Sequence, residues 1–214
     1  LNAAHKSIGV FSDKYNYIPF SIDLNHWNYK PKKTPKLKEL LFIGNDQNRD
    51  FELLYSIAKK HKEYNFTIVS KYDNYEFSKL KNVKFLQGNL RDNILLDTEI
   101  QSLYHRADLV ILPLKTSTQP SGQSVAIQSM SSGTPVMMTK TNGFWDSLHY
   151  IESKNILFVD SQNLIGWDIK LIQLSNNLDI LTTISSEGRK LIEANHDLNN
   201  FIKMLSDYSV EIEL

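Results

Sequence analysis

Short apolar runs alternate along this chain with longer amphipathic stretches, and this alternation constrains the fold more than any other feature. The apolar runs are rich in Leu, Ile, Val, Phe and Met, and each is four residues long. They comprise residues 40–43, 66–69, 83–86, 109–112, 135–138 and 156–159. Because both faces of such strands are apolar, the pattern is typical of a parallel sheet that is covered on both sides.

The stretches between these runs repeat their apolar residues with the period of a helix. They predict helices over residues 50–61, 96–106, 124–132, 145–151, 164–176, 180–195 and about 198–208. Strand–helix–strand units with right-handed crossovers build an α/β, doubly wound, Rossmann-like parallel sheet. We therefore expect a single Rossmann-like domain over residues 37–179, followed by C-terminal helices over residues 180–214.

Composition excludes several classes of function. The 214 residues carry 24 basic and 24 acidic side chains and no cysteine. Zero net charge argues against a nucleic-acid-binding protein, and the lack of cysteine excludes disulfides and thiolate metal sites. The six histidines show no metal-ligand spacing, and no apolar run approaches the roughly 20 residues of a membrane span. We expect no metal and no nucleic acid as partners.

The first 36 residues form a lead-in to the predicted domain. The chain starts at Leu1 without a leader sequence, which indicates a fragment of a longer protein, and residues 17–20 are compatible with a short strand. Five lysines and two prolines between residues 30 and 38 indicate a solvated linker. The alternative is a basic patch that contacts an anionic membrane surface.

In a sheet of this kind, ligands bind beyond the carboxyl ends of the strands. Gly44 and Asn45 directly follow the first strand, and Arg49 lies at the start of the next helix. Glycine lets the backbone approach a ligand closely, and an arginine there can bind phosphate with two parallel hydrogen bonds. The segment is no P-loop, because Gly-Lys-Ser/Thr does not follow.

The segment after the fourth strand holds the other candidate residues. Ser121, Gly122, Gln123 and Ser124 lead into a predicted helix, and Gln128 lies about one turn further along it. The free N–H groups and the positive dipole at a helix start favour an anion. The same residues partly match the Gly-x-Ser-x-Gly elbow of serine hydrolases. A ten-residue loop precedes them and no acid–histidine pair follows, so a hydrolase is disfavoured.

Residues 121–136 resemble the Gly-x-x-x-x-Glu-Ala-Met-Ala-x-Gly-x-Pro-Val signature of GT-B glycosyltransferases of the family 4, or group 1, type. Further segments agree with that family in order and spacing. They are Phe42-Ile43-Gly44 with Arg49, the run from Val83 to Gly88, the run from Leu103 to Leu109, Gly143 to Asp146, and Gly188-Arg189-Lys190. The resemblance covers about residues 17–208 and corresponds to the C-terminal, donor-binding half of such enzymes.

The resemblance implies transfer of a sugar from a UDP- or GDP-linked donor without metal or other cofactor, with retention at the anomeric carbon. Arg49 would be catalytic and neutralise the diphosphate leaving group. Gly44, Asn45 and the segment 121–124 would bind the donor, Asn89 would meet the base, and Gln128 the ribose. Residues 1–36 would connect to a missing N-terminal domain that binds a glycan, lipid or protein acceptor. Such enzymes commonly work in the cytoplasm, at the inner face of the membrane.

One departure from the family pattern concerns two glutamates that the family commonly places eight positions apart. Gln128 and Pro120 occupy these positions, so neither carboxylate is present. An amide can still bond a hydroxyl, but it cannot offer two anionic oxygens. Two alternatives therefore remain open: a catalytically silent nucleotide-sugar-binding module, and a nucleotide-sugar epimerase of the same fold.

Overall fold

The computed structural model describes residues 18–71, 73, 75–88, 95–160 and 162–212. Within these ranges, six strands form one parallel sheet in the order β3-β2-β1-β4-β5-β6. The strands are β1 (Glu39–Ile43), β2 (Asn65–Ser70), β3 (Val83–Gln87), β4 (Leu109–Leu112), β5 (Val136–Thr139) and β6 (Leu157–Val159). Each predicted strand is present within one or two residues of its expected bounds, and the strand order is that of a Rossmann fold.

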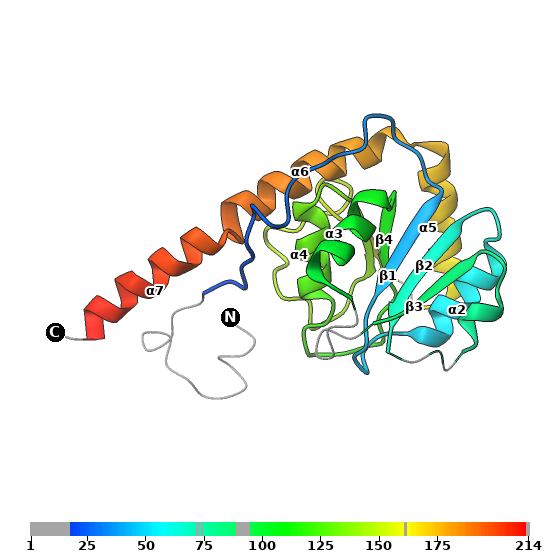
Figure 1. Ribbon diagram of the computed structural model, residues 1–214, viewed down its shortest axis with the longest axis horizontal. Coiled ribbons are helices and arrows are strands. Elements are labelled where there is room, and N and C mark those ends of the chain that lie inside the picture. The colour runs from blue at the N-terminus through cyan, green and yellow to red at the C-terminus, as the bar shows by residue number, and fades with distance from the viewer. Residues whose placement is uncertain (1–17, 72, 74, 89–94, 161, 213–214) are drawn as a thin grey trace.

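Helices cover both faces of the sheet (Figure 1). They are α2 (Phe51–Lys60), α3 (Asp97–Arg106), α4 (Gln123–Ser131), α5 (Leu164–Asn176), α6 (Asp179–Asn195) and α7 (Leu198–Ile212), with a short 3₁₀ turn η2 (Phe77–Lys79). Side chains of α3 and α4 pack in one core cluster and those of α2 and α5 in another, while α6 contributes to both. The α/β doubly wound class predicted from the sequence is confirmed.

The strands alternate between these two clusters residue by residue. Leu41 and Ile43 of β1 face α3 and α4, whereas Leu40 and Phe42 face α2 and α5. All four residues of β4 are buried in the same alternating way. Because successive side chains point to opposite faces, a strand in the middle of a covered sheet must be apolar at every position.

One predicted helix is wrong. Residues 145–151 form turns, although their apolar residues recur at helical spacing. The Asp146 side chain accepts hydrogen bonds from the backbone N–H groups of Leu148 and His149, and the Asn155 side chain bonds the backbone of His149 and Ile151. Such side-chain bonds compete with a helix for the same backbone groups.

The lead-in segment packs against the junction of α6 and α7. Residues 18–20 form no strand, and Ile22 makes only an isolated parallel bridge with Asp197. At this junction His196 is buried: its Nδ1 lies 2.7 Å from the carbonyl oxygen of Phe20, and its Nε2 lies 3.0 Å from the Tyr150 hydroxyl. The segment that precedes β1 and the C-terminal helices thus meet at this junction, and Arg189 of α6 adds a second contact by donating to the carbonyl of Trp27 at 3.2 Å.

Figure 1 shows α7 continuing the direction of α6 and extending away from the sheet. Its first half exposes Leu198, Ile202 and Leu205, which recur at positions i, i+4 and i+7 and so share one face. None of the helices described is both long and apolar enough to cross a membrane.

Candidate functional site

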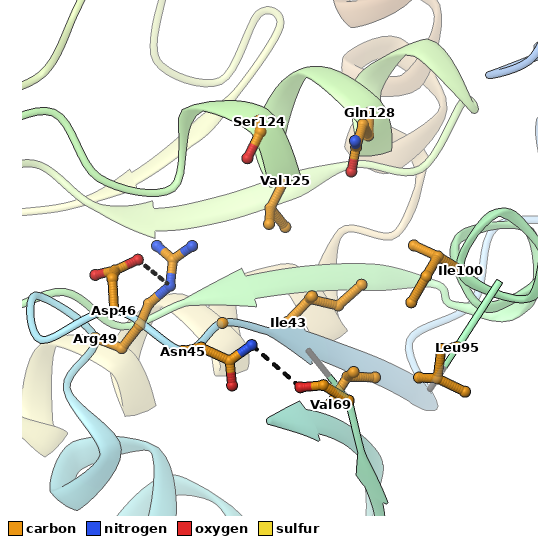
Figure 2. A pocket seen from close by; sticks show the side chains of 12 residues that line it. Ile43, Asn45, Asp46, Arg49, Val69, Leu95, Ile100, Ser124, Val125 and Gln128 are labelled. Atoms are coloured by element: carbon orange, nitrogen blue, oxygen red, sulfur yellow. Dashed lines mark hydrogen bonds and ion pairs between the residues drawn. The ribbon is translucent and has the colours of Figure 1, made fainter. Parts of the chain in front are cut away.

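The crevice between β1 and β4 is the point where the order of the strands reverses, which is where ligands bind in such sheets. The two loops that leave these strands are joined by backbone hydrogen bonds. Asp50 N–H donates to Pro113 at 3.0 Å, and Lys115 N–H donates to Asn48 at 2.9 Å. A cavity of about 260 Å³ opens beside them (Figure 2). The fold therefore forms a pocket at the position predicted from topology alone.

Arg49 is the most unusual residue of this pocket, because it carries a charge and is only 3% exposed. Its Nε lies 3.3 Å from Oδ2 of Asp46, and its Nη1 donates to Ser121 Oγ at 3.2 Å. Ser121 in turn donates to Asp46 Oδ1 at 3.0 Å. Burial lowers the pKa of Arg49, and Asp46 counteracts that effect, so the guanidinium stays charged.

Most of the guanidinium's hydrogen-bonding capacity is unused. Arginine carries five N–H donors, and the contact to Ser121 is its one side-chain hydrogen bond to the residues that the structure describes. Figure 2 shows the side chain reaching across the pocket toward α4. A buried cation with free donors is costly unless an anion accepts them, so this arrangement favours a negatively charged ligand.

Two glycines make room for Arg49. A Cβ at Gly44 would lie 2.2 Å from Arg49 Nε, and a Cβ at Gly122 would lie 2.9 Å from Nη1. Gly122 also adopts a φ of 80°, in the left-handed region that favours glycine. At Gly44, where sequence analysis predicts that the backbone approaches a ligand, the arginine side chain also lies against the backbone.

Helix α4 begins next to the guanidinium. Gly122 is its N-cap and gives no side-chain cap, so the first N–H groups of the helix are not bonded by a cap. The first helical hydrogen bond runs from Ala126 to Gly122 at 2.9 Å. The N–H groups of Gln123, Ser124 and Val125 and the dipole of α4 therefore add to the positive potential around Arg49.

Asn45 lines the pocket, but its side chain serves the fold. Its Nδ2 donates to the carbonyl of Gly88 at 3.1 Å, and its Oδ1 accepts from Ser70 Oγ at 3.2 Å and from the N–H of Lys71. These bonds join the carboxyl ends of β1, β2 and β3, and Figure 2 shows a dashed line at the side chain of Asn45. The ligand contact predicted for Asn45 competes with these internal bonds.

The other end of the pocket is apolar. Ile43, Val69, Leu95 and Ile100 line it together with Gly88. Gln128 borders this part from α4, and its Oε1 accepts a hydrogen bond from the Tyr104 hydroxyl at 3.0 Å. The pocket thus combines a cationic end with an apolar end, which suits a ligand with an anionic and a flat, less polar part.

The predicted residues fall into three groups. Gly44, Asn45, Arg49, Ser124 and Gln128 line the pocket. Ser121, Gly122 and Gln123 do not line the pocket: Ser121 bonds Arg49, Gly122 leaves room for its guanidinium, and Gln123 begins α4. Asn89 lies outside the described residues, so its role stays a prediction.

Sequence analysis missed the apolar lining of this site and two of its polar residues, Asp46 and Tyr104. Asp46 lies three positions before Arg49, a spacing that lets the two side chains pair within one turn. Tyr104 gave no local signal, because it reaches Gln128 from a different helix. Among the described residues, no three or more histidines or acidic side chains gather as metal ligands, and metal independence stays a prediction.

Comparison with known proteins shows to which family this chain belongs and which structures share its fold. The family profile described as glycosyl transferases group 1 matches residues 38–177, which is well over half of the chain. The chain belongs to this family. Its match spans the whole sheet and both sides of the pocket, so the resemblance noted from the sequence is confirmed.

Solved structures of group 1 and related glycosyltransferases share the fold. Sucrose-phosphate synthase from Thermosynechococcus elongatus superimposes with a TM-score of 0.78 at 17% identity, over 99% of this chain and 56% of that one. Anabaena HepE in complex with UDP-glucose superimposes with a TM-score of 0.75 at 15% identity, over 98% of this chain and 61% of that one. The C-terminal domain of LpcC from Francisella tularensis gives 0.61 at 17% identity, over 83% of this chain and all of that domain.

This glycosyltransferase chain therefore spans little more than half of the length of the first two of these proteins. Identities below a fifth establish the fold and not the substrate. In sequence, no curated protein matches the chain.

Proposed function

We propose that this chain is the donor-binding domain of a group 1 glycosyltransferase, and that the crevice between β1 and β4 binds a nucleotide-sugar through its diphosphate. The observation that carries the proposal is the buried Arg49 with unused donors beside the uncapped start of α4. Both features supply positive potential to one place, and a diphosphate has the charge and the acceptor oxygens to match them.

The proposed chemistry follows from this electrostatic arrangement. When the bond between sugar and diphosphate breaks, negative charge grows on the leaving phosphate. A preformed cation and fixed N–H dipoles stabilise that charge without reorganisation, which is usually the largest single contribution to catalysis. We propose that Arg49 and α4 fill the role that a metal ion has in other transferases, and that transfer proceeds with retention.

The nucleotide part fits the other end of the pocket. The apolar residues Val69, Leu95 and Ile100 can hold a base, and Gln128 lies where a ribose would join base and phosphate. HepE was crystallised with UDP and with UDP-glucose, and it shares this fold, which supports a UDP-linked donor. The sequence resemblance implies a UDP- or a GDP-linked donor without ranking them, so a GDP-linked donor is the alternative.

The acceptor would bind through a second domain. We propose that residues 18–36 lead from it and that α7 packs against it. The exposed apolar face of α7 at Leu198, Ile202 and Leu205 supports this arrangement, as does coverage of 56–61% of the sucrose-phosphate synthase and HepE chains. A glycan, lipid or protein acceptor and contact with a membrane surface belong to the same proposal.

Titration of purified variants with nucleoside diphosphates tests the donor site. Arg49→Ala removes a charge-assisted phosphate contact of about 1.5–3 kcal/mol, so affinity should fall roughly 10- to 150-fold. Arg106→Ala is the matched control, because it removes the same charge from the exposed end of α3 at the opposite edge of the sheet. Equal affinity of the two variants would remove Arg49 from the site.

The two alternatives are separated by product analysis. The missing glutamates at positions 120 and 128 favour a silent binding module. Such a module would bind the diphosphate but release no nucleotide from its sugar conjugate in the presence of acceptors. An epimerase would return a nucleotide-sugar, or a free sugar, of altered configuration.

A further inference from the structure

Gln128 differs from an ordinary binding glutamine, because its carbonyl oxygen is already engaged within the protein. The Tyr104 hydroxyl donates to Oε1 at 3.0 Å, and Tyr104 is fully buried. A phenol is a good donor and an amide oxygen a good acceptor, so this orientation of the amide satisfies both groups. If the amide rotated by half a turn, its nitrogen would donate to the phenol oxygen, and the buried hydroxyl proton would have no acceptor among the residues that the structure describes.

Tyr104 itself is held firmly. The ring of Trp27 packs edge-on against it, with centroids 5.7 Å apart and planes at 74°. Its backbone carbonyl accepts from Thr134 Oγ1 at 2.7 Å. Burial raises the pKa of Tyr104 far above its usual value, so the hydroxyl keeps its proton.

The amide nitrogen of Gln128 is free for a ligand. None of the residues that the structure describes accepts a hydrogen bond from it, and Gln128 lines the pocket one turn beyond Ser124. With Oε1 engaged and Nε2 open, the side chain presents two donors to the pocket. A glutamate at this position would present acceptors instead.

We propose that Tyr104 fixes the orientation of the Gln128 amide, so that Gln128 can only donate hydrogen bonds to the ligand. The ribose of the bound nucleotide is then recognised through a hydroxyl oxygen that accepts a hydrogen bond from Gln128. We call this the polarity of the site. The inference rests on the proposed function, because it places a nucleotide in the pocket. Tyr104 is a positioning residue in this scheme, and it acts on the ligand only through Gln128.

Nucleotide analogues distinguish this polarity from its opposite. The chain and its variants are titrated with whichever of UDP, GDP and ADP it binds. Each ribose hydroxyl is then replaced in turn by hydrogen or by a methyl ether. The ether keeps the acceptor oxygen and loses the proton, whereas the deoxy analogue loses both.

Gln128→Glu reverses the polarity, since a carboxylate needs a proton from the ligand. Methylating the hydroxyl that meets residue 128 should weaken binding to both proteins. The loss of affinity should be larger in Gln128→Glu than in the unmodified chain, by a factor of about 10 or more. The bulk of the methyl group is the same in both proteins and cancels from the comparison. If, for each of the two ribose hydroxyls, methylation cost Gln128→Glu and the unmodified chain the same affinity, the proposal would be overturned.

Tyr104→Phe tests the positioning role, because it keeps the ring and removes only the hydroxyl. It should weaken the natural nucleotide by about 2- to 10-fold and leave the affinity for the matching deoxy analogue unchanged. Equal weakening of both ligands would show that Tyr104 only supports the fold.

If no diphosphate binds the unmodified chain, the proposed function fails together with this inference. If a diphosphate binds in an Arg49-dependent way and the analogue losses are equal, only the inference fails.

Discussion

At the scale of single residues, the site is organised around a buried cation with an incomplete set of partners. Asp46 is the one carboxylate that pairs with Arg49 in the described structure, and its side chain is 48% exposed. The pair holds the guanidinium in place, but the exposed carboxylate also repels an incoming phosphate. Asp46 should therefore limit the affinity of the site.

Asp46→Asn separates these two effects, because it keeps the shape of the side chain and removes the charge. Asp46 is half-exposed but Arg49 is buried, so the variant leaves a buried charge without its counter-charge and should unfold at lower denaturant concentration. Its affinity for the diphosphate should rise about 2- to 5-fold. Calorimetric titration measures that change, and an affinity equal to or below that of the unmodified chain would contradict it.

The residues that sequence analysis identified here share one property: each follows a predicted strand, so the topology of the sheet predicts where it lies. Gly44, Arg49 and Gly122 all lie in segments that follow the carboxyl end of a strand, which is where ligands bind in such sheets. Their interactions were not predictable, because Arg49 and Ser121 are 72 positions apart and meet only in the folded chain. The same holds for Tyr104 and Gln128, 24 positions apart.

At the scale of elements, the start of α4 depends on a backbone conformation that only glycine adopts easily. Gly122→Ala should cost about 1–2 kcal/mol of unfolding free energy, and its methyl group would displace the Arg49 guanidinium. Gly133→Ala is the matched control, since Gly133 follows the other end of α4 with a φ of 86°. Both variants should lose stability in denaturant titrations, and only Gly122→Ala should lose nucleotide affinity. Equal affinities would contradict a role for this helix start in binding.

Sequence periodicity predicted the strands and most helices because each buries an apolar face of regular spacing. It failed at residues 145–151, where Asp146 and Asn155 bond the backbone that a helix would need. It also missed the 3₁₀ turn at Phe77–Lys79, which follows Glu76 in a left-handed conformation. Both differences come from local polar bonds that a hydrophobic pattern does not contain.

At the scale of the whole molecule, the junction of α6 and α7 ties the N-terminal segment to the C-terminal helices through a buried histidine. Burial lowers the pKa of His196, an effect opposed by its bond to Phe20 and by Asp146. The unfolded chain therefore binds the proton more readily. Stability should be complete above a pH of about 6.5 and should decrease as the pH falls below it.

His196→Gln should remove this part of the acid sensitivity. Urea unfolding near neutral pH and again about one unit below the ordinary histidine pKa measures the difference. His105→Gln is the control, because His105 lies in the last turn of α3 and its ring bonds the carbonyl of Asn28 at an exposed position away from His196. If His196→Gln lost stability with acid as steeply as the unmodified chain, the buried histidine would not be the cause.

The central claim is that the crevice between β1 and β4 binds the diphosphate of a nucleotide-sugar. A crystal structure of the chain grown with UDP, GDP or ADP in the absence of metal tests it most directly. We predict a phosphate within hydrogen-bonding distance of both Arg49 and the first N–H groups of α4, with the ribose beside Gln128. A nucleotide bound elsewhere on the chain, with this crevice empty, would contradict the claim.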